Sequence, residues 1–326
     1  MKKLTSTSLL TVLRNSVMYL ILVALMIFFA VQNDVFLTLN NLRNIINQAS
    51  YQIIVGVGIG LVMLSGGMDL SVGYQMSLIG VCMGWLMSFT SIPWPVVFLI
   101  GILLGVVLSL FNGILTVKLQ VFPFILTLAT SYIYQGISYT ITQTQTYRNF
   151  PDMFKWFGQG KIGPIPVAII IMVVCVVIGS LILNKTYFGR YIYGIGSNEK
   201  AVELAGVNVN RMKLVIYALA GVFVALGTIV LISRSGSSAS SMGPGTEFTI
   251  IAGGILGGIK MGGGGGKMSS IVIGVLILTV LSNGMQLMQL NIYPQYIVRG
   301  FVLIFAIGFD TYQSMQVIKK AKQIKD

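Results

Sequence analysis

The segment WPVVFLIGILLGVVLSLFNGILT, residues 94–116, runs for 23 residues without a charged side chain. A helix needs about 20 mostly apolar residues to cross the hydrocarbon core of a bilayer, which is roughly 30 Å thick. The apolar residues follow one another continuously, whereas in the strands of a membrane barrel they alternate with polar ones. The segment therefore predicts a membrane-spanning helix.

Similar apolar runs recur along the whole chain of 326 residues, which has a mean hydropathy of +0.88. Hydrophobic residues make up 55% of it and charged residues only 9%, whereas soluble domains carry about 25% charged residues. No polar segment between the runs exceeds about 30 residues, too short to bury a core of its own. We therefore predict an all-α polytopic membrane protein, one transmembrane domain over residues 1–326, with about ten transmembrane helices. The predicted spans are residues 16–32, 49–65, 70–89, 94–116, 121–142, 166–184, 213–232, 246–259, 269–288 and 293–309.

The basic residues divide unevenly between the two sides of this predicted topology. With the N-terminus in the cytoplasm, 15 of the 21 lysines and arginines fall in inner segments and 5 in outer ones, and Arg299 lies inside the last span. The positive-inside rule therefore predicts that both termini are cytoplasmic. This topology, together with anionic lipid, accounts for the net charge of +13 without a nucleic-acid partner. The inner set is Lys2, Lys3, Arg14, Lys118, Lys185, Arg190, Lys200, Arg211, Lys213, Lys260, Lys267, Lys319, Lys320, Lys322 and Lys325, and the outer set is Arg43, Arg148, Lys155, Lys161 and Arg234.

Several other features bear on the class of protein. The chain has no histidine, and its two cysteines, Cys82 and Cys175, fall in predicted spans and fit buried free thiols, so we predict no metal site. The first apolar run follows basic residues and lacks a small-residue cleavage site, which favours a retained helix over a signal peptide. Only eight acidic residues are present, with no paired carboxylates and no nucleophile beside a base. An integral-membrane enzyme is therefore the least favoured class.

Two glycine-rich stretches resemble phosphate-binding loops but lack required residues. MGGGGGKMSS, residues 261–270, has Met261 where a Walker A loop needs glycine and Met268 where it needs serine or threonine. YIYGIGSNEKAVELAGVNVNR, residues 191–211, has Glu199 where a dinucleotide-binding fingerprint has its third glycine, and a carboxylate there repels a pyrophosphate. We interpret the first stretch as a flexible turn and predict no nucleotide site in either.

The stretch at 191–211 instead predicts a short capped helix inside the longest inner loop, residues 185–213. Ser197 and Asn198 are good N-cap residues, and Gly206 suits a left-handed C-cap. The eight residues 198–205 would span about 12 Å. A helix this short is marginal in water, so we expect it to form because something packs on it. The residues alone leave open whether it is a connector lying on the membrane surface or a docking surface for another protein.

Five stretches, in one order over nearly the whole chain, carry a family resemblance. They are LVMLSGGMDLSVGYQMSLIG (61–80), VFPFILTLAT (121–130), FGRYIYGIGSNEKAVELAGVNVNRMK (188–213), GPGTEFTIIAGGILGG (243–258) and YPQYIVRGFVLIFAIGFD (293–310). Together they resemble the permease subunits of bacterial ABC importers for ribose, galactose and related simple sugars. The resemblance implies a fold similar to the vitamin B12 type of importer and a place in the bacterial cytoplasmic membrane.

The same resemblance implies partner proteins, and the sequence departs from the family pattern at two places. Such permeases work as pairs, receive sugar from a soluble binding protein outside, and are driven by cytoplasmic ATPases, so ATP would be used by a partner and no cofactor bound by this chain. The loop 185–213 would be the coupling loop that fits the ATPase, through Gly196, Ser197, Asn198, Glu199, Ala201, Glu203, Ala205 and Gly206. Relatives often carry an acidic residue where this chain has Thr249, and the run of five glycines at 262–266 is longer than the usual turn.

Polar residues within apolar runs are costly in lipid and tend to face a cavity or a partner helix. In GGMDLSVG, we expect Asp69 to cap a helix that begins at Leu70, close to the inner face. The helix-break or gate candidates are Gly66, Gly67, Asp69, Ser71 and Gly73. Candidates for the substrate pathway are Asn112, Thr127, Thr130, Gln135, Asn283 and Gln286, each of which also fits a plain hydrogen bond between helices.

The outer loop, residues 143–165, mixes aromatic and basic residues. Phe154, Trp156 and Phe157 fit an interfacial aromatic belt. The candidates for docking the binding protein are Arg148, Lys155, Lys161, Arg234 and Glu247, of which the four cations would pair with its acidic residues. Glu247 begins the eighth predicted span on the outer side, where it would cap that span or meet the binding protein.

We expect this chain to be the translocating subunit of an ATP-driven sugar importer. The alternative is an ion-coupled secondary transporter, which would need an ionisable residue in mid-membrane to carry the coupling ion. Apart from Arg299, the sequence places no such residue there. The identity of the sugar, and whether the permease pair consists of one chain or two, stay open at this level.

Overall fold

The computed structural model describes residues 6–323, so Lys2, Lys3 and Lys325 of the predicted inner set lie outside it. The described chain is helical apart from one two-stranded hairpin, which confirms the all-α prediction. The elements are α1 (Ser6–Gln32), α2 (Leu39–Leu64), α3 (Val72–Phe89), α4 (Trp94–Leu119), α5 (Pro123–Thr142), α6 (Asp152–Gln159), β1 (Lys161–Ile162), β2 (Ile165–Pro166), α7 (Val167–Lys185), α8 (Tyr187–Leu204), α9 (Val209–Ser235), α10 (Thr246–Leu256), α11 (Met268–Leu287) and α12 (Ile292–Gln323).

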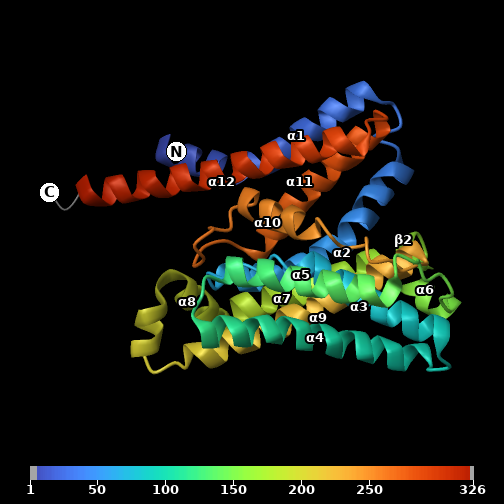
Figure 1. Ribbon diagram of the computed structural model, residues 1–326. Coiled ribbons are helices and arrows are strands. Elements are labelled where there is room, and N and C mark those ends of the chain that lie inside the picture. Colours follow the sequence, from blue (N-terminus) through green and yellow to red (C-terminus); the bar gives the residue numbers. More distant parts are fainter. Residues whose placement is uncertain (1–5, 324–326) are drawn as a thin grey trace.

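The helices form two layers (Figure 1). The larger layer contains α3, α4, α5, α7 and α9, with α6 at one end and α8 at the other. The smaller layer contains α1, α11 and α12, and α10 lies between the two layers. Helix α2 passes from one layer into the other and contacts α7, α9, α10 and α11, so it connects the two layers.

Each of the ten predicted runs is helical, and six of them are long and apolar enough to cross a bilayer. These six are α2, α3, α4, α7, α9 and α11. Helices α1, α10 and α12 contain shorter apolar stretches, Met18–Gln32, Thr246–Leu256 and Tyr293–Gly308. The count of ten crossings therefore stays a prediction, whereas a multi-pass membrane protein is confirmed.

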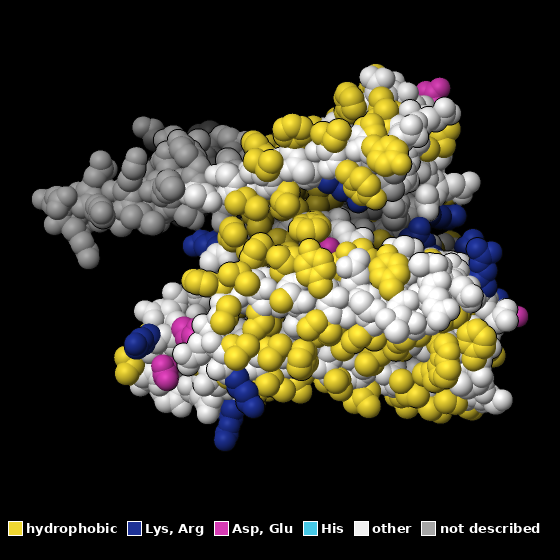
Figure 2. All heavy atoms as spheres, viewed as in Figure 1, with side chains coloured by type: hydrophobic (Ala, Val, Ile, Leu, Met, Phe, Trp, Pro, Cys, Tyr) yellow, Lys and Arg dark blue, Asp and Glu magenta, His cyan; other side chains and the backbone are white. Residues whose placement is uncertain are grey.

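Charged side chains gather at the two ends of the larger layer and in the hollow between the layers, while apolar side chains cover its flank (Figure 2). On α4 and α7 many large apolar side chains are exposed, including Leu99, Leu103, Val173 and Val177. This distribution fits a layer whose long axis runs across a bilayer and whose flank faces lipid.

Close packing inside the larger layer depends on small residues. Gly105 of α4 faces Gly221 of α9, and a Cβ added at Gly105 would lie 2.5 Å from the Gly221 carbonyl oxygen and 2.8 Å from the Cβ of Ala225. Small residues let helix backbones approach closely, which matters in lipid because no hydrophobic effect drives helices together there. Close van der Waals packing of the two backbones therefore stabilises the crossing of α4 and α9.

The segment 143–165 is more ordered than its sequence indicates. It contains α6 and the hairpin in which Lys161 pairs with Pro166 and Ile162 with Ile165. The Ser233 hydroxyl of α9 donates to the Phe154 carbonyl oxygen at 2.6 Å and accepts from the Gly158 N–H at 2.9 Å. The Phe154 side chain is fully buried, so its assignment to an interfacial aromatic belt was wrong, whereas Trp156 is 43% exposed.

Candidate functional site

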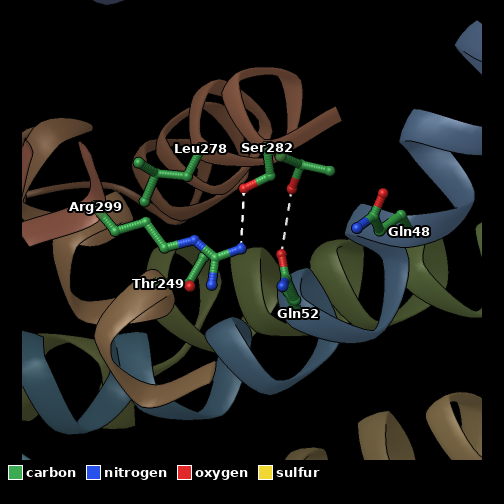
Figure 3. A pocket seen from close by; sticks show the side chains of 7 residues that line it. Gln48, Gln52, Thr249, Leu278, Ser282 and Arg299 are labelled. Atoms are coloured by element: carbon green, nitrogen blue, oxygen red, sulfur yellow. Dashed lines mark hydrogen bonds between the residues drawn. The ribbon is translucent and has the colours of Figure 1, made fainter. Parts of the chain in front are cut away.

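A small polar cavity lies where α2, α10, α11 and α12 meet (Figure 3). Its volume is about 20 Å³, and its lining consists of two amides, three hydroxyls, one guanidinium and one leucine side chain. The lining residues are Gln48 and Gln52 of α2, Thr249 of α10, Leu278, Thr279 and Ser282 of α11, and Arg299 of α12. A water molecule needs roughly 10–15 Å³ of such space, so the cavity as it stands is the size of a single water.

The polar groups of this cavity bond to one another across helices. Arg299 Nη2 donates to the Ser282 hydroxyl at 3.1 Å, which joins α12 to α11. Thr279 Oγ1 lies 3.2 Å from Gln52 Oε1 and donates toward it, which joins α11 to α2. In Figure 3 the guanidinium extends between Thr249 and Ser282, toward the centre of the cavity.

The charge of the cavity is unbalanced. None of the seven described side chains that line it is acidic, and no described carboxylate lies within ion-pair distance of Arg299. An uncompensated guanidinium in a membrane-embedded site is costly, which makes such a residue a functional candidate. Thr249, singled out from the sequence because relatives often carry an acid there, faces this same cavity.

Sequence reasoning identified Arg299 and Thr249 but missed the other polar lining residues. A signal was present in their spacing: Gln48 and Gln52 are four residues apart on one helix, and Thr279 and Ser282 are three apart on another. Residues three or four apart share one helix face, so each pair marks a polar stripe on an otherwise apolar helix.

A second polar cluster surrounds Asp69 in the break between α2 and α3. Its carboxylate accepts from the Ser71 N–H at 2.9 Å, from the Ser71 hydroxyl at 2.6 Å and from Gln75 Nε2 at 3.1 Å. Asn112 Nδ2 of α4 lies 3.3 Å from the same carboxylate, and the Tyr134 hydroxyl of α5 donates to Asn112 Oδ1 at 3.1 Å. The prediction that Asp69 caps a helix beginning at Leu70 was wrong in position, because α3 begins at Val72 with Ser71 as its N-cap, and Asp69 instead holds the Ser71 N–H and hydroxyl.

Glu247 lies in a different place from the one predicted. It is only 4% exposed, and its carboxylate accepts the N–H of Gly245 at 3.0 Å. It also lies against Gly73 in the first turn of α3, where an added Cβ would overlap its carboxylate. Of the two predicted roles, capping of the eighth span fits this position in the first turn of α10, whereas docking of the binding protein is contradicted by the burial. The apolar run could not show that α10 is short and starts inside the protein.

The N-terminal turns of α3 and α10 thus meet inside the bundle, each with a carboxylate beside it. Interrupted helices whose N-termini meet within the membrane are a recurrent feature of transporter sites. Asp69 and Glu247 are both buried, so ionisable residues other than Arg299 lie inside the helical bundle. Both carboxylates have backbone donors, which is the arrangement expected for helix-capping groups.

The predicted pathway residues do not form one lining. Asn112 belongs to the Asp69 cluster, and Thr127 Oγ1 accepts the Leu70 N–H beside it at 3.0 Å. Thr130 is buried one turn further along α5 and donates to the Thr127 carbonyl. Asn283 exchanges two hydrogen bonds with Asn41, at 3.0 and 3.1 Å. The other two candidates lie apart, Gln135 half-buried and Gln286 exposed.

The predicted capped turn is present within α8, which bends at Asn198. Asn198 has non-helical angles (φ −160°, ψ 94°) and its Oδ1 accepts the Ala201 N–H at 3.0 Å, which confirms it as the N-cap. Gly206 has φ +85° and its N–H donates to the Glu203 carbonyl at 2.9 Å, which confirms the left-handed C-cap. The turn runs over residues 199–204 and follows directly on a preceding helix that includes Ser197. It is therefore shorter than predicted and is not an isolated helix.

The surface of this turn is open in the described chain. Ala201, Glu203 and Ala205 are exposed, and Leu204 is 86% exposed, an unusual position for a large apolar side chain. Glu199 forms an ion pair with Lys213 at the start of α9, at 2.7 Å. The turn is thus fixed at its base while its apolar tip faces outward.

Beneath the turn, three segments that are distant in sequence touch through glycine backbone. The Gly264 N–H donates to the Leu64 carbonyl at the end of α2, at 2.9 Å. A Cβ added at Gly263 would lie 2.5 Å from the Gly66 nitrogen and 3.0 Å from the Gly196 Cα. We call Gly66, Gly196, Gly263 and Gly264 the glycine junction. It joins the α8 turn to the break before α3 and to the loop between α10 and α11, and Gly67 follows it in that break.

The four cations predicted to dock the binding protein differ in exposure and in whether they are already paired. Arg148 and Lys161 are exposed. Lys155 forms an ion pair with Asp152 at 3.1 Å, and Arg234 is half-buried with Nη1 3.5 Å from the Asn47 carbonyl. Only Arg148 and Lys161 therefore present unpaired cations among these four described residues.

The chain matches known transport proteins over most of its length. Residues 41–307 match the family described as the permease component of a branched-chain amino acid transport system. The chain is 34% identical to the galactose/methyl galactoside import permease protein of Escherichia coli K12, over 95% of this chain and 98% of that protein. It is 33% identical to the ribose import permease protein of Escherichia coli K12, over 89% and 92%, and 35% identical to that of Bacillus subtilis 168, over 91% and 92%.

No solved structure was found to match the chain. The family match covers well over half of the residues, and the similarity to the three permeases extends over most of each protein. The chain therefore belongs to this family of membrane permease components of transport systems.

Proposed function

We propose that the chain is the permease subunit of an ATP-driven ABC importer that carries a monosaccharide, ribose or a related pentose or hexose. The observation that carries this proposal is the near full-length similarity to permeases named for ribose and for galactose import. The neutral amides and hydroxyls of the polar cavity support it, since such groups hydrogen-bond a sugar without holding it too tightly for release.

We base the orientation of the chain in the membrane on the distribution of its basic residues. The proposed chain crosses the bacterial cytoplasmic membrane ten times in the vitamin B12-importer arrangement, with both termini in the cytoplasm. The α8 turn then faces the cytoplasm, and α6 with the hairpin faces the outside, where the exposed Arg148 and Lys161 meet acidic residues of a sugar-binding protein. A second permease chain completes the pathway.

The docking surface for the ATPase is the turn at residues 199–204. An exposed Leu204 surrounded by small and polar residues fits a groove on a protein partner, and the capped turn is already formed in the chain alone, which lowers the entropy cost of docking. The ATPase uses the ATP, and its closure pushes on the turn. The glycine junction passes the movement to α2 and to the loop that leads into α11.

Substitutions that add a positive charge to the turn test its role in docking the ATPase. In the proposed complex, Glu203→Arg or Ala205→Arg abolishes co-purification of the ATPase and sugar uptake while membrane insertion stays normal. Asn184→Arg, which adds the same charge at an exposed site near the end of α7, is the matched control and keeps both activities. Normal uptake in the two turn variants overturns the docking assignment.

The buried Asp69 and Glu247 favour one second candidate, an ion-coupled secondary transporter. That function predicts sugar uptake by the chain alone, driven by a proton or sodium gradient and independent of ATP. The proposed importer shows no uptake under those conditions, so proteoliposomes that contain only this chain separate the two.

A further inference from the structure

We infer that the polar cavity between α2, α10, α11 and α12 is a sugar-contact site on the translocation path, at which Arg299 donates hydrogen bonds to the oxygen atoms of a neutral monosaccharide. This inference rests on the proposed function and assigns the contact residues within it. The site is distinct from the Asp69 cluster, and none of the six predicted pathway residues lines it.

The chemistry of the lining matches that of a sugar. A monosaccharide presents hydroxyl groups, which both donate and accept, on an otherwise apolar ring. Arg299 supplies five donors, of which the structure engages one with Ser282, and the two glutamines supply donors and acceptors. The Gln48 side chain has no hydrogen-bond partner among the described residues, so its amide is available to a ligand. Leu278 provides the apolar contact for the ring.

The electrostatics favour an oxygen-rich ligand. Arg299 has no acidic partner among the described residues, and Thr249 lies in the first turn of α10, whose N-terminus carries partial positive charge. Sugar oxygens replace the missing acceptors without adding a net charge. A neutral sugar also leaves the site more easily than an anion, which would pair with the guanidinium in two parallel bonds.

The position of the cavity suits a path across the membrane. Thr279 and Ser282 lie in the second half of α11, and Arg299 lies two turns into α12. Under the proposed orientation both ends belong to the outer side, where the binding protein delivers sugar. The cavity is too small for a sugar as it stands, so sugar entry requires the surrounding helices to move apart.

Two matched pairs of variants test the inference in the complete importer, reconstituted with its ATPase and sugar-binding protein. Thr279→Val removes the hydroxyl beside Gln52, and Thr228→Val removes a hydroxyl that makes the same 2.8 Å bond to a helix carbonyl but lies buried in α9. Arg299→Gln removes the cavity cation, and Arg43→Gln removes a half-buried cation elsewhere on α2.

The expected result is a lower maximum rate of sugar uptake in the cavity variants, about tenfold or more for Arg299→Gln, since hydrogen bonds to charged groups are worth at least one factor of ten. ATP hydrolysis stimulated by the binding protein persists, so fewer sugars cross per ATP. The two control variants match the wild type. The apparent KM stays unchanged, because the binding protein captures the sugar.

A second measurement keeps the test valid if Arg299→Gln fails to insert. In a chain with Cys82→Ala and Cys175→Ala, a cysteine introduced by Ser282→Cys is labelled with a small hydrophilic thiol reagent during turnover. Transported sugar slows labelling if the cavity holds it. Equal labelling with and without sugar, or equal uptake in Thr279→Val and Thr228→Val, overturns the inference. If the wild-type complex itself shows no ATP-dependent uptake, the proposed function fails instead.

Discussion

Replacing Gly263 by alanine perturbs the glycine junction where it contacts the Gly66 backbone. Gly263 has φ +80°, and a left-handed conformation costs a residue with a Cβ about 1–2 kcal/mol. The new methyl group would also lie 2.5 and 2.6 Å from the Gly66 nitrogen and Cα, which are backbone atoms that cannot rotate away. Forcing such an overlap costs about 1–3 kcal/mol, so the two effects together predict a loss of roughly 2–5 kcal/mol in unfolding free energy.

The adjacent glycine provides the control for this variant. Gly262 has no atom within 4 Å of an added Cβ and no positive φ, so Gly262→Ala is expected to stay within about 0.5 kcal/mol of the wild type. Thermal unfolding of the purified proteins in detergent compares the two. Uptake and ATPase co-purification are then measured at a temperature at which both variants are folded.

The proposed route for movement makes a further distinction. Gly263→Ala is expected to keep the ATPase bound, because the tip of the α8 turn is untouched, yet to reduce sugar uptake per ATP. Equal melting temperatures and equal uptake for Gly263→Ala and Gly262→Ala would show that the three segments do not depend on this contact, and would refute the coupling route.

Two further predictions concern folding. Asp69→Asn places an amide NH₂ group among donors from Ser71 and Gln75 and leaves at least one buried donor unpaired, so we expect the unfolding free energy to fall by about 1–3 kcal/mol. A reduced yield of folded protein with unchanged sugar preference would agree with this, whereas an altered sugar preference at normal yield would contradict it. Gly105→Ala is expected to lower the unfolding free energy by about 1–3 kcal/mol, because the new methyl group overlaps with Gly221. The control is Gly136→Ala, which has open space around the added methyl group, and equal thermal stability of the two variants would argue against close packing of α4 on α9.

Local features of the chain were predictable because local residues determine them. The caps at Asn198 and Gly206 depend on residues within one or two turns, and both are present in the structure. The helical runs were predictable for the same reason, since an apolar run in lipid must satisfy its own backbone hydrogen bonds.

Long-range features were not predictable from one sequence. Glu247 looked like the outer end of a span, because an apolar run does not reveal that its helix begins inside the bundle against Gly73. The polar cavity escaped notice because its residues come from four helices, and only the packing brings Gln52 to Thr279 and Arg299 to Ser282. The five-glycine run looked like a flexible turn, whereas it contains part of a tight contact with Gly66 and Gly196.

We propose that this chain moves a monosaccharide only as part of an ATP-driven complex. The most direct test is uptake of radiolabelled ribose and galactose into proteoliposomes that contain the chain alone, the chain with its ATPase, or the chain with its ATPase and binding protein. We expect accumulation of one of the two sugars, and only in the complete system with ATP. Accumulation by the chain alone, driven by a proton or sodium gradient, would contradict it.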